Sequence, residues 1–341
     1  MTLLTTDTTI TYPDGATTST GTVIHVELLS DGLSAVLLDT TAFHPVDTAW
    51  PDQPADHGTI TTEARGTQAI VDAVTGGIHE GQLFLGADLP VRTGTDGWVF
   101  VVAHIVDGPA PAIGDIARID VDVAYRAALS VAHTACHLAA LALDAALAAA
   151  WSKPVSADAL GNPAFDSLAI RSSRISPHHS VDIYRIGKSL RRKGFIPSSL
   201  DDLDAVANQI NAQLAQWVDA GGVVRIERDD TALSARRTWV CVLPGGRTDI
   251  PCGGTHAHDL AELSAVITSF TATEADGALE LTMETVVSPT TAARPWDAPH
   301  RDWLLSEAQT APVGRSFNGL QIDARTVQFL PFGAMPANST P

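Results

Sequence analysis

The sequence is poor in basic residues, with 21 Lys and Arg against 39 Asp and Glu and a formal net charge of −18 at pH 7. Generic nucleic-acid-binding proteins are basic, because neutralisation of phosphates supplies much of their affinity. This composition excludes a uniformly basic binding surface. A polyanionic partner would have to bind to a local basic cluster.

Cysteine is also scarce, since the chain contains only Cys136, Cys241 and Cys252. An odd, small number of cysteines in a chain of 341 residues argues against a disulfide scaffold. We therefore expect a cytoplasmic protein with reduced thiols, which is the state that a metal site needs.

Long hydrophobic segments are missing as well. The most apolar run, residues 127–151, is interrupted by His133, His137 and Asp144, so we expect no membrane span. The N-terminus has no basic segment followed by an apolar run, so we expect no signal peptide.

What remains is a chain that is 45% hydrophobic, enough for a sizeable core and about two domains. Short β-rich runs separated by turn residues predict a small β-barrel over residues 1–118, with a hairpin at residues 21–40. Residues 119–290 alternate between helical and strand patterns, which predicts a second, α/β two-layer domain and an α+β protein overall. Residues 291–341 form a C-terminal extension, whose Trp296, Trp303 and Phe317 are suited to cover a core or a dimer contact.

Two helices are predicted in the second domain. An Ala- and Leu-rich pattern predicts a long helix from about Val121 to Trp151, which Lys153-Pro154 ends. A second helix is predicted over Ser199–Ala220, with Ser199 as its cap. Residues 155–177 are expected to be irregular.

Two short motifs carry the chemistry. His133 and His137 lie four positions apart on the long helix, and Cys252 and His256 lie four positions apart in a Cys-Gly-Gly-Thr-His segment. Residues i and i+4 share one face of a helix, and the glycines allow a tight loop that brings both of its ends to one ion. Three imidazoles and one thiolate suit Zn²⁺. The alternative is a core cysteine with solvated histidines.

Four protein ligands make a closed, structural zinc site, whereas catalysis needs an open position. A hydrolytic role therefore requires one ligand, for which His256 is the first candidate, to be weak or displaced. Zinc can then activate water for hydrolysis of an ester.

At these motifs the sequence resembles the editing domain of alanyl-tRNA synthetase and of its freestanding trans-editing relatives, the AlaX proteins, with a related domain in threonyl-tRNA synthetase. The resemblance extends to Leu38–Pro45, a Leu-Asp-x-Thr-x-Phe-x-Pro run, and to Asp56-x-Gly58. It covers roughly residues 20–290 and leaves out the C-terminal extension.

The resemblance implies a zinc-containing deacylase that hydrolyses the ester between a wrong amino acid and tRNA. It implies His133, His137, Cys252 and His256 as metal ligands. Thr134, Cys136 and Thr255 are the candidates for placing substrate or water.

The sequence departs from the family pattern in two places. The Gly-Gly-Gln segment is replaced by residues 46–53, which keep only Gln53, and Cys136 stands where the family usually has threonine. A thiol is larger than a hydroxyl and a weaker donor. We therefore expect an altered substrate, a serine- or threonine-like and even non-proteinogenic amino acid, although Cys136 is equally suited to be a small apolar filler.

One basic cluster stands out in the acidic chain. Lys188, Arg191, Arg192 and Lys193 fall within six positions and can neutralise phosphates near the acceptor end of a tRNA. The alternative is a solvated turn.

Three functions remain open: an aminoacyl-tRNA hydrolase, a hydrolase of small esters or amides without tRNA, and a binding module with structural zinc. The oligomeric state, monomer or homodimer, is also open.

Overall fold

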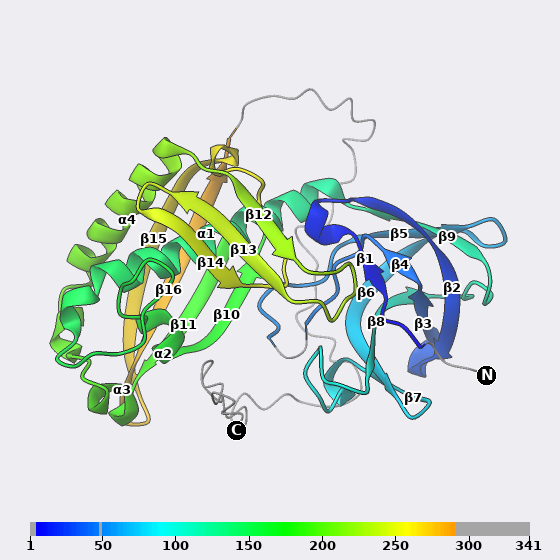
Figure 1. Cartoon of the computed structure of the whole chain (residues 1–341), viewed down its shortest axis with the longest axis horizontal. Helices are drawn as coiled ribbons and strands as arrows, with labels where there is room; N and C mark the ends of the chain where they lie inside the picture. The colour runs from blue at the N-terminus through cyan, green and yellow to red at the C-terminus, as the bar shows by residue number, and fades with distance from the viewer. Residues whose placement is uncertain (1–4, 48–49, 291–341) are drawn as a thin grey trace, which may run out of the picture. The chain divides into compact units, whose positions relative to one another are not determined.

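The first half of the chain builds a seven-stranded antiparallel sheet (Figure 1). The computed structural model describes residues 5–47 and 50–290. The strands of this sheet are β2 (Thr18–Leu28), β3 (Leu33–Leu38), β5 (Gly58–Thr62), β6 (Gly66–His79), β7 (Gln82–Leu85), β8 (Val99–Asp107) and β9 (Ile116–Val121). They are ordered β5-β9-β2-β3-β8-β6-β7, and an added pairing of β5 with β6 closes six of them into a ring.

Alternating side chains explain this ring. In β9, Ala117, Ile119 and Val121 are buried while the residues between them point outwards, as expected of strands with one face on a core. The predicted hairpin is confirmed, because β2 pairs with β3 in antiparallel register and Gly32 (φ 80°) occupies a left-handed conformation in the turn. Two further short strands, β1 (Thr9–Ile10) and β4 (Thr40–Thr41), pair in parallel beside the ring.

The second half contains two more sheets. One has four antiparallel strands in the order β10-β11-β16-β15, namely β10 (Ile170–Ser176), β11 (His179–Ile186), β16 (Ala278–Pro289) and β15 (Leu263–Ala275). The other has three, β12 (Val224–Arg228), β13 (Arg237–Leu243) and β14 (Gly246–Pro251). The helices are α1 (Val123–Ala146), α2 (Phe165–Ala169), α3 (Lys188–Arg192) and α4 (Leu203–Ala220). The prediction of a mixed α+β protein is confirmed.

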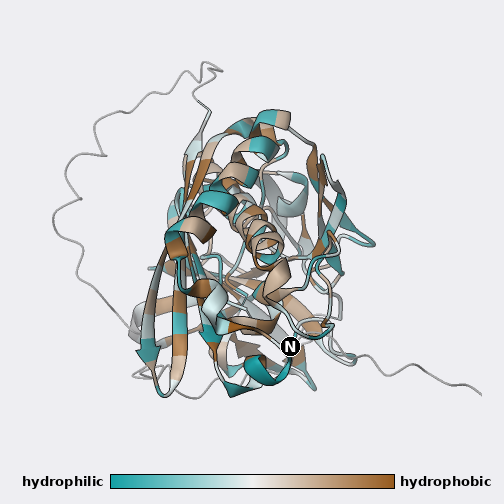
Figure 2. Cartoon of the chain, turned by 90° about the vertical axis from the view of Figure 1, so that its left-hand side faces the viewer, coloured by the Kyte–Doolittle hydropathy of each residue, from teal (hydrophilic) through white to brown (hydrophobic). Residues whose placement is uncertain are grey.

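Helix α1 forms the centre of the larger core and lies between the four-stranded and three-stranded sheets (Figures 1 and 2). Its alanines allow close packing, and Asp122 caps its first turn by accepting a hydrogen bond from the Tyr125 amide at 3.0 Å. By length and composition α1 could cross a membrane. However, 72% of its most apolar segment is buried within the protein, and the core helices of soluble proteins can have the same length and composition.

The structure corrects two local predictions. The cap of α4 is Asp202, which accepts from the Ala205 amide at 2.9 Å, whereas the Ser199 hydroxyl donates to the Ile196 carbonyl. Residues 155–177 are not irregular throughout, since they contain all of α2 and all of β10.

Strand β11 was missed because its buried face is partly polar. Ser180 and Asp182 point into the core beside Tyr184, so the apolar alternation that marks a strand is hidden. The predicted C-terminal extension, residues 291–341, lies outside the described residues.

Candidate metal centre

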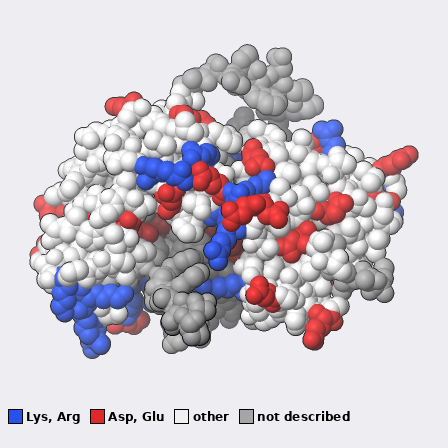
Figure 3. Space-filling view, viewed as in Figure 1, with Lys and Arg blue, Asp and Glu red and all other residues white. Residues whose placement is uncertain are grey.

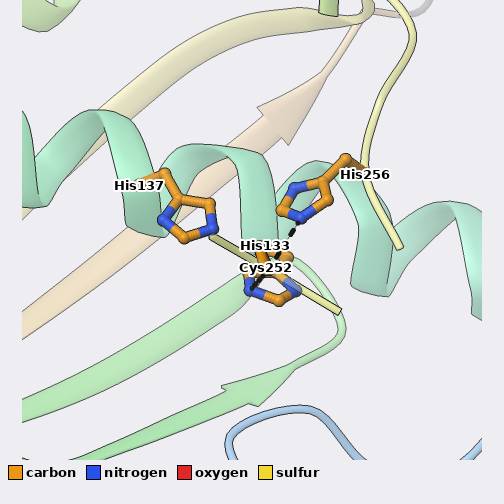
Figure 4. Close-up of side chains that lie close together, drawn as sticks. All are labelled: His133, His137, Cys252 and His256. Carbon is orange, nitrogen blue, oxygen red and sulfur yellow. Dashed lines mark hydrogen bonds between the residues drawn. The ribbon is translucent and has the colours of Figure 1, made fainter. Parts of the chain in front are cut away.

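The four predicted ligands come together at the middle of α1 (Figure 4). His133 and His137 lie one turn apart on the helix, Cys252 directly follows β14, and His256 lies in the loop after it. The ligand atoms of all four lie within 4.8 Å of one another. The Cys252 Sγ atom is 3.4 Å from His133 Nε2 and 3.2 Å from His256 Nε2. Zn–S and Zn–N bonds of about 2.3 and 2.0 Å put two ligands of one ion about 3–4 Å apart. The cluster can therefore hold a metal ion.

The buried side chain of Gln53 decides which nitrogen of His133 faces the cluster. Its Oε1 accepts a hydrogen bond from the Thr255 amide at 3.0 Å, and its Nε2 donates to Thr255 Oγ1 at 2.8 Å. A backbone amide only donates, so Oε1 is an acceptor, and His133 Nδ1, at 2.8 Å, must donate to it. The lone pair of the neutral imidazole is then on Nε2, which faces Cys252.

Thr134 supports His256 from α1. Its hydroxyl oxygen accepts from the Ala257 amide at 3.1 Å and lies 3.4 Å from His256 Nδ1. If Nδ1 carries the proton, Nε2 of His256 also presents a lone pair to Cys252. This arrangement of a ligand histidine held through its second nitrogen is typical of metal sites.

His137 lacks such support. Neither of its ring nitrogens has a hydrogen-bond partner among the described residues, and Nε2 is buried. An orphaned polar atom inside a protein is costly unless something satisfies it. A metal ion at the centre of the cluster is a fitting partner, so the residues present fit such a group.

Burial favours the neutral forms of all four groups in the absence of metal. It lowers the pKa of His133 to about 3, lowers the pKa values of His137 and His256 well below their usual range, and raises the pKa of the Cys252 thiol to about 12. Neutral imidazoles are ready to coordinate. Metal binding would have to release the thiol proton.

The second glycine of the Cys-Gly-Gly-Thr-His segment, Gly254, has a steric reason. A Cβ atom at Gly254 would lie 2.4 Å from His133 Cε1 and 2.6 Å from Gln53 Oε1. Any other residue at Gly254 would push the ligand and its support apart, so the loop can approach the helix only with glycine there.

The hydroxyls of Thr134 and Thr255 are both used within the protein. Thr255 Oγ1 receives hydrogen bonds from Gln53 and, at 2.9 Å, from the Ser130 hydroxyl. Both threonines are buried. They position the ligands, and a direct role towards substrate stays a prediction.

Cys136 lies beside the cluster without joining it. Its Sγ atom is 3.6 Å from both carboxylate oxygens of Asp182 and 3.8 Å from the Ser173 hydroxyl. Burial raises the pKa of Asp182 to about 7 and raises that of the Cys136 thiol. The surroundings of Cys136 are therefore polar, which does not match a purely apolar filler.

Sequence reasoning missed Asp52. Its Oδ2 lies 3.5 Å from His133 Nε2, on the ligand side of that ring. Burial raises the pKa of Asp52 to about 6. In the sequence, Asp52 directly precedes Gln53, the residue retained from the family segment, which was the one available sign of its importance. Nothing in the spacing indicated that Asp52 lies next to α1.

The basic cluster lies apart from the metal centre. Side chains of Lys and Arg gather over α3 at the lower left of Figure 3. No residue of this cluster forms an ion pair within residues 5–47 and 50–290; the cluster consists of Lys188, Arg191, Arg192 and Lys193. The residues next to α3 pack at the C-terminal end of α1, where Phe195 bridges to Trp151. That end is about 14 Å along the helix from His137 at 1.5 Å per residue.

No model of a known protein family matches the chain, and no curated protein matches it.

Proposed function

We propose that this protein is a zinc-dependent hydrolase that removes a wrongly attached serine- or threonine-like amino acid from tRNA. The proposal rests on the cluster of His133, His137, Cys252 and His256, whose N₃S donor set suits Zn²⁺. The sequence resemblance to the freestanding editing relatives of alanyl-tRNA synthetase supplies the substrate. On this proposal the six-stranded ring corresponds to the small β-barrel of that family, and residues 119–290 to its editing domain.

Substrate would approach the centre from its more accessible side. Cys252 and His137 are partly exposed, whereas His133 and His256 are buried. His133 and His256 are each held through Nδ1, whereas neither ring nitrogen of His137 has a hydrogen-bond partner among the described residues. This favours His137 over the predicted His256 as the ligand that yields a coordination position.

Bound zinc would supply Lewis acidity towards the ester carbonyl and the attacking water. In the reaction, water adds to the carbonyl carbon, the bond from that carbon to the ribose oxygen breaks, and the proton from water passes to the leaving hydroxyl. The chain's part is to orient: Gln53 and Thr255 hold His133, Thr134 holds His256, and Gly254 admits the loop.

The basic cluster at α3 supports an RNA substrate. None of its four cationic side chains forms an ion pair with a carboxylate of the described residues, although the net charge of the chain is −18. An unneutralised cluster of this kind can bind phosphates without a generally basic surface.

A second candidate function is a binding module with structural zinc. The observation that favours it is the packing of four ligand atoms within 4.8 Å of one another, which suits a closed site. Such a module would bind charged tRNA without cleaving it.

One experiment separates these functions. Zinc-loaded protein is incubated with Ser, Gly, Ala and Thr esters of tRNAs for alanine and threonine, and ester loss is followed beside His133→Ala and simple aminoacyl esters without RNA. Loss of one tRNA ester, abolished in His133→Ala, is expected. Cleavage of the simple esters alone would point to a small-ester hydrolase. Intact esters with zinc and tRNA bound would point to the binding module.

A further inference from the structure

The carboxylate of Asp52 is held by hydrogen bonds from the Gln53 amide and from the Trp50 side chain, and one of its oxygens is directed at the metal centre. Oδ1 accepts a hydrogen bond from the Gln53 amide at 2.7 Å. Oδ2 lies 3.5 Å from His133 Nε2. No Lys or Arg among residues 5–47 and 50–290 forms an ion pair with this carboxylate. It is therefore a mostly buried anion without a cationic side chain beside it.

The backbone around Asp52 is anchored to the edge strand β10. The Asp52 carbonyl accepts from the Ile175 amide at 2.8 Å, and the Pro51 carbonyl accepts from Arg174 Nη1 at 3.3 Å. On the other side Gln53 is bound to His133 and Thr255. Pro51 and Asp52 are thus tied to β10, and Gln53 is tied to α1 and to the loop after β14, so the direction of the carboxylate is set by the fold.

His133 Nε2, which faces Oδ2, cannot donate a hydrogen bond to it. His133 Nδ1 donates to Gln53, so Nε2 presents a lone pair, and two acceptors 3.5 Å apart repel unless a positive charge lies near both. A metal ion held by the cluster would take up the lone pair of His133 Nε2. Asp52, however, is not one of the four residues whose ligand atoms lie within 4.8 Å of one another. It lies beside the cage, where it can bind a positive group carried by a ligand of the ion.

An aminoacyl ester carries such a group. Its α-ammonium is attached to the carbon next to the ester carbonyl, so a carbonyl oxygen bound near the ion would bring the ammonium towards an anion that lies next to the ligand set. We propose that the Asp52 carboxylate binds the α-ammonium of the substrate and makes the site selective for esters of amino acids with a free amino group. This inference rests on the proposed function.

The proposal also defines what the site rejects. An N-acylated amino acid or a peptide on tRNA has a neutral amide in place of the ammonium and would leave the carboxylate buried and unpaired. Leaving a charged group without its partner costs more than losing a neutral hydrogen bond. Peptidyl esters and N-blocked aminoacyl esters would therefore be poor ligands.

The test uses two uncleavable probes, so that it does not depend on turnover. One is serine joined to adenosine through a 3′-amide, and the other is its analogue with a hydroxyl in place of the amine. Binding of both to the zinc-loaded protein is measured by calorimetry, for the native protein, for Asp52→Asn and for Asp96→Asn. Asp96 is exposed, so its substitution removes the same charge away from the site.

The native protein and Asp96→Asn are expected to bind the amine about 10- to 100-fold more tightly than the hydroxyl analogue. Asp52→Asn, with unchanged zinc content, should bind both alike. Equal binding of the probes by the native protein, absence of binding by both, or a preference that survives in Asp52→Asn would overturn the proposal. A preference that depends on Asp52 in a protein that cleaves no tRNA ester would leave the proposal standing and remove the proposed function instead.

Discussion

Gln53 and His133 lie 80 positions apart in the chain and are joined by a hydrogen bond of 2.8 Å between Oε1 and Nδ1. This contact directs His133 Nε2 towards Cys252 and joins the loop after the first strands to the centre of α1. It makes the loop a part of the metal centre, although no residue of the loop is one of the four ligands.

We expect Gln53→Ala to weaken zinc binding by about 10- to 100-fold, because groups that orient a ligand histidine typically contribute that much. Affinity is measured by competition with a chromophoric chelator. Gln82→Ala, an exposed position in β7, is the control and should bind zinc as the native protein does. Unchanged affinity in Gln53→Ala would mean that His133 is oriented by something else.

Removal of zinc should destabilise the fold, because the ion would bind only the folded cluster. At a zinc concentration of a thousand times Kd, the linkage contributes about 4 kcal/mol, which corresponds to a fall in Tm of about 6 °C for a chain of this length. Thermal melts with and without a chelator measure it. Cys252→Ser should show little further change on chelation, and a native protein whose Tm ignores the chelator would contradict a stabilising site.

The buried ion pair between Arg126 and Asp56 should be important for stability. Both side chains are almost fully buried, and Arg126 Nη2 also donates to the Ala42 carbonyl at 2.9 Å. We expect Arg126→Ala to cost about 3–5 kcal/mol in the free energy of unfolding, because it leaves Asp56 without its partner. Urea denaturation measures it. Arg118→Ala, which breaks an exposed ion pair, should cost less than about 1 kcal/mol.

Stability should fall as pH rises from about 4 to about 9, in part through Asp144. Burial raises its pKa to about 9, with repulsion from Asp166 adding to the effect. The folded state then holds a proton that the unfolded chain releases near pH 4, so the stabilisation is complete below that pH and is lost on the way to pH 9. For a single group the slope is at most about 1.4 kcal/mol per pH unit.

Asp144→Asn keeps an oxygen for the Asp166 amide, which donates to Asp144 Oδ1 at 2.7 Å, and should flatten this dependence. The measurement is the unfolding free energy in urea at a series of pH values. Asp96→Asn should follow the native curve. An Asp144→Asn curve parallel to the native one would show that Asp144 is ionised in the folded protein.

If the cluster at α3 binds phosphates, Arg191→Ala should weaken tRNA binding and reduce the slope of log affinity against log salt by about 1. Filter binding over a range of salt concentrations measures both quantities. Arg247 is exposed but paired with Glu227 and Asp249, so Arg247→Ala should leave the slope unchanged. Equal slopes in the two variants would mean that α3 faces solvent only.

The sequence alone was sufficient for features that depend on local periodicity and on residue chemistry. The i, i+4 spacing of His133 and His137 on an Ala-rich helix, and the paired glycines between Cys252 and His256, predicted the four-residue cluster. Alternation and turn residues likewise predicted the β2–β3 hairpin and the mixed α+β class. Within each pair the residues lie a few positions apart, where helix, strand and turn geometry determine which side chains meet. The donor chemistry and the family resemblance, not the spacing, joined the two pairs of ligands into one predicted site.

The tertiary structure decided what surrounds the ligands. Gln53 meets Thr255 across 202 positions, and the Asp52 carbonyl is held by β10, a strand that the sequence did not reveal. Polar residues of β11 such as Asp182 face the core of the protein and conceal the apolar alternation that marks a strand. Contacts of this kind arise only when separate elements pack, because spacing along a chain carries no record of which distant loop closes over a given helix.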